Sequence, residues 1–123
     1  MKKEKELLSL LNSKNKIKMK EQPNINYIKE LSGGDVEFEE KMLSILQKEL
    51  PVEIETYLNT LNINKLQQTA EIVHKIKHKI SILGLEKSYQ FAIQYEKELL
   101  EGNKSKHDDF IEILNTMSDF LTK

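Results

Sequence analysis

The chain contains no cysteine, no arginine and no long apolar run. Without cysteine it can form neither a disulfide, nor a thiolate metal site, nor a cysteine nucleophile. Without arginine, any anion must be bound by lysine, histidine, hydroxyl or backbone N–H groups, because no side chain offers a bidentate guanidinium. No stretch approaches the roughly 20 apolar residues that span a bilayer, and the first apolar cluster is too short for a signal peptide. We therefore expect a cytoplasmic protein without membrane insertion.

Positive and negative charges nearly balance over the 123 residues. The 19 lysines stand against 20 aspartates and glutamates, a net charge of −1, so the charge gives no reason to expect nucleic-acid binding. The length is that of one ordinary domain, which excludes a multidomain enzyme. Residues 1–20 alone hold seven lysines and two glutamates. We predict a lysine-rich, partly ordered leader over 1–22 and one helical domain over 23–123.

Apolar residues recur at three- and four-residue steps through most of the chain, the spacing of amphipathic helices. The pattern predicts a short helix over 26–31, ended by Gly33 and Gly34, and a long helix over 36–60 with Asp35 as its N-cap. Pro51 lies inside the long helix, where a proline kinks a helix or splits it into two stacked halves. Further helices are predicted over 65–83, 86–101 and 106–121.

No segment shows the strict alternation of a half-buried strand. Four long helices joined by short turns predict an all-α fold: an up-down antiparallel four-helix bundle, with the short helix covering one end.

The predicted helix over 65–83 carries two of the three histidines. At about 100° per residue, its apolar positions fall on one side of the helix: Thr69, Val73, Ile76, Ile80 and Leu83. His74, Lys77, His78 and Ser81 form a polar stripe at i, i+3, i+4 and i+7. His74 projects away from the apolar side, which argues against a buried structural histidine. The alternative is that both histidines are ordinary surface residues.

An exposed histidine followed one turn later by a lysine suits phosphoryl chemistry. A free imidazole has a pKa of about 6.5, so a fraction is uncharged and nucleophilic near neutral pH. Lys77 supplies positive charge where phosphoryl oxygens would lie. Phosphoryl transfer requires little more than positioning and charge stabilisation, so His74 and Lys77 on a rigid helix can form a minimal site.

The run from Val73 to Gly84 resembles the signature of histidine-containing phosphotransfer (HPt) domains of phosphorelays. There the phosphorylated histidine is followed by an apolar residue at +2, lysine at +3, glycine at +4, an apolar residue at +9 and glycine at +10. The positions that match in register are His74, Ile76, Lys77, Leu83 and Gly84. Glu96, after Tyr95, resembles an acidic position in the family's next helix, and the entry to the long helix at 31–35 is also similar. The likeness covers about residues 25–121.

Two positions depart from the signature. His78 stands where the family usually has glycine, whose missing side chain lets an incoming receiver domain reach the phosphohistidine. Val73 replaces the commoner alanine. Counting from His78 instead of His74 loses the lysine and glycine matches, which favours His74 as the phosphoacceptor.

The resemblance implies a phosphorelay intermediate rather than an enzyme with stand-alone catalysis. His74 would accept a phosphoryl group from a receiver-domain aspartyl phosphate and pass it to another receiver. Lys77 would stabilise the phosphoryl oxygens, His78 and Ser81 would surround them, and Gly84 would shape the helix end. The resemblance implies no cofactor, no metal of its own, and a monomer whose partners are receiver domains of response regulators or hybrid histidine kinases.

Alternatives stay open at this stage. The chain could be a helical adaptor, or a degenerate HPt domain that docks receivers without phosphotransfer, because His78 can narrow the approach. Glu71, His74 and His78 also share one helical sector with the Glu-x-x-His spacing of di-iron bundles. His107, the only other histidine, has no glutamate three residues before it, so at most an adventitious metal pair is predicted. Three further lysines either add positive charge around the site or are ordinary solvated residues: Lys75, Lys79 and Lys87.

Overall fold

The computed structural model describes residues 21–123, so residues 1–20 of the leader predicted over 1–22 lie outside the described residues. The described residues form helices joined by short turns, with no strand among them. The helices are α2 (Asn26–Ser32), α3 (Val36–Asn62), α4 (Leu66–Ile82), α5 (Glu86–Leu100) and α6 (His107–Leu121). Their bounds agree with the predicted ranges to within two residues. The all-helical prediction is thus confirmed for this part of the chain.

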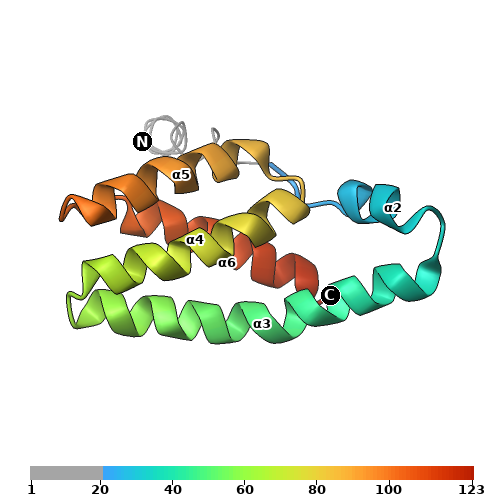
Figure 1. Cartoon of the computed structure of the whole chain (residues 1–123), viewed down its shortest axis with the longest axis horizontal. Helices are drawn as coiled ribbons and strands as arrows, with labels where there is room; N and C mark the ends of the chain where they lie inside the picture. Colours follow the sequence, from blue (N-terminus) through green and yellow to red (C-terminus); the bar gives the residue numbers. More distant parts are fainter. Residues whose placement is uncertain (1–20) are drawn as a thin grey trace, which may run out of the picture.

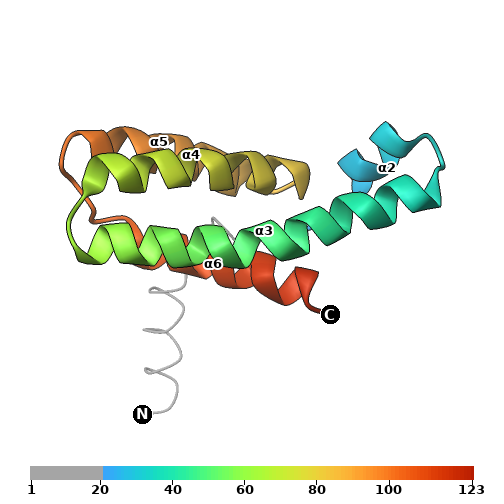
Figure 2. The same cartoon turned by 60° about the horizontal axis from the view of Figure 1, so that its bottom comes forward.

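The four longer helices lie lengthwise beside one another (Figure 1). α4 packs against both α5 and α3, and α3 also contacts α6. α2 lies beyond the α4–α5 turn and packs on the first part of α3 (Figures 1 and 2). It buries Ile28 completely. The arrangement is a helical bundle with the short helix near one end.

The apolar faces of the helices meet in one core. Its centre includes the fully buried Tyr57, Tyr95 and Phe110. The five positions that the periodicity assigned to the apolar side of α4 are all 0% exposed: Thr69, Val73, Ile76, Ile80 and Leu83. Burying one aliphatic side chain of this size contributes about 1.5–3 kcal/mol, so the rotation of α4 about its axis is firmly determined. The polar stripe of α4 must therefore face away from the core.

Pro51 does not divide the long helix. α3 continues from Val36 to Asn62 with Pro51 inside it, so the split into two stacked halves does not occur, and α3 follows a gently bent path (Figure 2). The proline removes one bond of the helix ladder. Buried residues on both sides of it, Leu50 and Tyr57 among them, hold the two parts of α3 against the bundle and offset that loss.

Lys79 joins α4 to α3. Its Nζ lies 2.8 Å from Oε2 of Glu53 and 2.9 Å from Oε1 of Glu49, and the side chain is buried. Burial works against the charged ammonium, but the hydrogen bonds to Glu53 and Glu49 outweigh it and the pKa of Lys79 is raised. The sequence suggested that Lys79 surrounds His74 or is solvated, and both suggestions are wrong because the side chain turns toward α3.

The α4–α5 turn is braced by the segment that precedes α2. Gly84 has a φ of +77°, and a Cβ there would lie 2.7 Å from Nδ2 of Asn24. The backbone N–H of Asn24 donates a hydrogen bond to the carbonyl of Leu83 (2.9 Å). Glu21 accepts hydrogen bonds from the N–H groups of Lys87 (2.6 Å) and Ser88 (2.9 Å). This carboxylate satisfies free N–H groups at the start of α5. Glu21, assigned to the leader by composition, therefore contacts the helical domain.

Candidate functional site

The polar stripe of α4 lies beside α5, and its residues differ in exposure. The side chain of His74 is 50% exposed, and His78 and Ser81 are exposed as well. Lys77 is only 12% exposed because its side chain turns toward α5. The prediction that His74 stands outside the core is confirmed.

Glu96 on α5 connects the two functional side chains of α4. Its Oε2 lies 3.0 Å from Nδ1 of His74, and its Oε1 lies 2.9 Å from Nζ of Lys77. An ionised carboxylate only accepts hydrogen bonds, so Nδ1 of His74 carries the proton and its N–H donates a hydrogen bond to Glu96. In the neutral ring the lone pair is then on Nε2. Glu96 thus selects the tautomer of His74 and holds its ring in place.

The imidazole of His78 stands next to this nitrogen. The Nε2 atoms of His74 and His78 are 3.4 Å apart, and the rings meet edge to face with centroids 4.9 Å apart and an interplanar angle of 85°. The side chain that replaces the family's glycine therefore lies directly beside the candidate nucleophile.

Ser81 and Gly84 take no direct part in this cluster. The Ser81 hydroxyl forms no hydrogen bond to any residue of 21–123, although the Ser81 carbonyl accepts the N–H of Gly84 (3.0 Å). Gly84 acts on the end of α4, as the sequence predicted, and Lys87 lies in the first turn of α5. The structure brings together His74, Lys77, His78 and Glu96.

A hollow of about 410 Å³ adjoins His74 between α4 and α5. Its lining residues are Gln67, Ala70, Glu71, His74, Lys75, Glu96 and Leu100. On α5, the apolar side chains of Ile93 and Leu100 are exposed on either side of Glu96. His74 therefore stands on a surface that mixes a depression, positive charge and exposed apolar groups.

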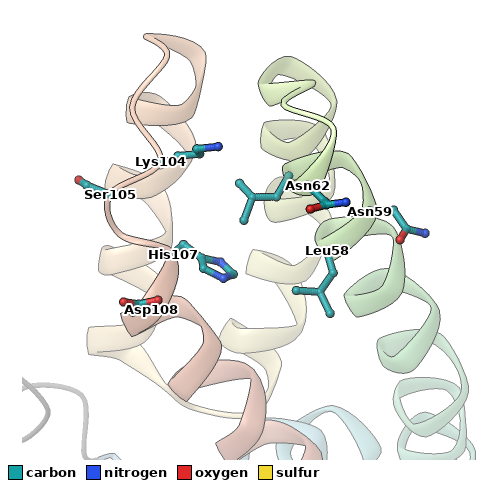
Figure 3. Close-up of a pocket in the computed structure, with 8 residues that line it drawn as sticks. Leu58, Asn59, Asn62, Lys104, Ser105, His107 and Asp108 are labelled. Carbon is teal, nitrogen blue, oxygen red and sulfur yellow. The ribbon is translucent and has the colours of Figure 1, made fainter.

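A second hollow of about 680 Å³ opens where α3 ends and α6 begins (Figure 3). His107 at the start of α6 points toward α3 there, and its Nδ1 lies 2.7 Å from the hydroxyl of Tyr57. That hydroxyl is also 2.7 Å from the hydroxyl of Tyr95 on α5. Burial raises the pKa of both tyrosines, so both hydroxyls keep their protons at neutral pH. This chain of hydrogen bonds joins three helices, which gives His107 a structural role.

Comparison of the chain with family models, with curated proteins and with solved structures gives no match. No helix within residues 21–123 is long and apolar enough to cross a membrane. In the same residues, no group of three or more histidine, aspartate or glutamate side chains is placed to hold a metal ion. A functional proposal must therefore be argued from the geometry around His74.

Proposed function

We propose that this chain is a phosphorelay intermediate of the histidine-containing phosphotransfer type, built on an up-down four-helix bundle, with His74 as the phosphoacceptor. One observation carries the proposal. The half-exposed imidazole of His74 is held through Nδ1 by the Glu96 carboxylate at 3.0 Å, so its Nε2 carries the lone pair, toward which Nε2 of the exposed His78 is directed at 3.4 Å.

The transfer step needs no proton transfer. Nε2 of His74 attacks the phosphorus of a receiver's aspartyl phosphate, the N–P bond forms, and the P–O bond to the aspartyl group breaks. The electron pair of that bond leaves with the aspartate carboxylate. Nδ1 keeps its proton, so positive charge grows on the ring, and Glu96 is placed to stabilise that charge. Transfer to a second receiver is the same step in reverse.

Lys77 adds the positive charge that phosphoryl oxygens require. It lies one turn after His74, and its ammonium group is held by Glu96, with Nζ of Lys77 2.9 Å from Oε1 of Glu96. Because the apolar side of α4 is fully buried, both residues project from a rigid support. Such fixed charge is the main contribution that a protein makes to phosphoryl transfer.

A receiver domain must also dock on this surface. Ile93 and Leu100 on α5 offer exposed apolar contacts on either side of Glu96, and exposed apolar groups beside a polar site are typical of protein-binding surfaces. The proposed partners are receiver domains of response regulators or hybrid histidine kinases, met by a monomeric chain in the cytoplasm.

The test is transfer of labelled phosphoryl groups from a panel of phosphorylated receiver domains. We expect label on the wild-type chain and on the His78→Ala variant, and none on His74→Gln. Equal labelling of wild type and His74→Gln would remove His74 from the mechanism. Receivers that bind without transferring label would favour an adaptor or a degenerate domain, for which the proximity of His78 to His74 is the structural argument.

A further inference from the structure

The two histidines of α4 present a pair of nitrogen atoms at the spacing of two ligands on one metal ion. Their Nε2 atoms are 3.4 Å apart. Zinc binds imidazole nitrogen at about 2.0–2.1 Å with tetrahedral angles, which places two such nitrogens about 3.3–3.4 Å apart. The separation of the His74 and His78 nitrogens therefore matches that of a zinc chelate. Zinc would replace the hydrogen bond between them, with the proton of the His78 ring on Nδ1.

We propose that Nε2 of His74 and Nε2 of His78 together bind a Zn²⁺ ion, and that bound zinc blocks phosphorylation of His74. The second part rests on the proposed function, because zinc would occupy the lone pair that attacks the phosphoryl group. The first part depends only on the two imidazoles and their support.

Glu96 completes the arrangement found around zinc-binding histidines. A metal-bound histidine usually donates its other ring N–H to a carboxylate or carbonyl, which fixes the ring and strengthens the bond to the metal. Nδ1 of His74 meets Glu96 at 3.0 Å in this way. The same hydrogen bond that would prepare His74 for phosphoryl transfer therefore also prepares it as a zinc ligand.

The charges and exposure of neighbouring groups set the strength of binding. Both histidines are exposed, so an ion can reach them from solvent. Lys77 adds positive charge nearby, but its ammonium group is paired with Glu96. Residues 21–123 place no third protein ligand beside the pair, so within this part of the chain the other coordination positions are open to water. The site should bind zinc more weakly than a closed four-ligand site, which suits reversible blocking.

The first experiment measures zinc binding to the unphosphorylated full chain, by competition with a chromophoric zinc chelator and without any receiver. We expect one zinc per chain for the wild type and for His107→Gln, a matched control that removes the histidine on α6 and leaves both histidines of α4 in place. His78→Gln and His74→Gln should lose this binding, and Glu96→Ala should weaken it about tenfold. Unchanged binding by His78→Gln, or none by the wild type, would overturn the proposal.

The second experiment measures the rate of phosphotransfer with and without zinc and compares the ratio within each variant. Zinc should slow the wild type and His107→Gln while leaving the ratio for His78→Gln near one. Equal slowing of wild type and His78→Gln would place the effect on the receiver and refute the blocking. If no receiver transfers label even without zinc, the proposed function fails, whereas the zinc titration still decides the metal site.

Discussion

The carboxylate of Glu96 offers the sharpest test of how the site works. Glu96→Gln keeps an oxygen that can accept a hydrogen bond from the Nδ1–H of His74 but removes the negative charge. Glu96→Ala removes both, and it also leaves the ammonium group of Lys77, 12% exposed, without its partner at 2.9 Å. We expect phosphoryl transfer to His74 to slow in both variants, and more in the alanine variant.

The size of the effect follows from the separation and exposure of the charges. Two unit charges about 4 Å apart interact by about 1 kcal/mol in water and about 4 kcal/mol at the effective dielectric constant near a protein surface. His74 is 50% exposed and Glu96 is 22% exposed, so a value in the lower part of this range applies. A loss of about 1.4 kcal/mol slows Glu96→Gln about tenfold. Losing the charge-assisted hydrogen bond as well slows Glu96→Ala about a hundredfold.

The assay is single-turnover transfer from one phosphorylated receiver at saturating concentration, so that docking affinity does not enter the rate constant. Glu101→Gln is the matched control, because it removes the same charge from an exposed position just after α5 and should transfer at the wild-type rate. Transfer to Glu96→Ala at the wild-type rate would show that the contact with His74 has no part in the chemistry.

Two further predictions concern stability. Replacing Lys79 by methionine removes the cation that pairs with Glu53, whose Oε1 is already buried without a hydrogen-bond partner among the described residues. We expect this change to lower the free energy of unfolding, measured by urea denaturation, by about 3 kcal/mol. Because the pKa of Lys79 is raised, its stabilising effect is complete below about pH 10.4 and is lost as the pH rises through the folded-state value, where wild type and variant should converge. Gly84→Ala adds a Cβ at 2.7 Å from Asn24, whereas Gly102→Ala, with a φ of +91°, meets no atom within 4 Å. In both variants the left-handed backbone conformation should lower the free energy of unfolding by about 1–2 kcal/mol. Thermal unfolding should show a further decrease of about 1 kcal/mol for Gly84→Ala. Equal decreases in the two variants would mean that Asn24 moves aside freely.

Helix positions could be predicted because their signals are local. Asp35 accepts the N–H of Phe38 at 3.2 Å, as an N-cap should, and Gly33 ends α2 in the left-handed conformation. Pro51 shows the limit of such signals. Its cost is local and readable, but the burial that outweighs this cost comes from other helices, so the continuity of α3 could not be judged from the pattern around the proline.

For the candidate site too, the sequence predicted the features of a single helix but not the contacts between helices. The apolar period of α4 implied that His74 is exposed, and the structure agrees. The resemblance singled out Glu96 as an acidic position, but nothing in the periodicity indicated its contact with His74, which is 22 positions away in the chain. Lys79 and Lys75 look alike as sequence, yet one is buried against α3 and the other is exposed.

By itself, the sequence determined which segments are helical, which side of α4 is buried, and that a histidine and a lysine lie one turn apart on its polar side. Only the packing of α4 against α5 decided that Glu96 holds both of them, and only the side-chain conformations decided that His78 lies at 3.4 Å from His74. Periodicity describes one helix at a time, whereas a contact between helices depends on their relative rotation and distance, which the whole core sets together.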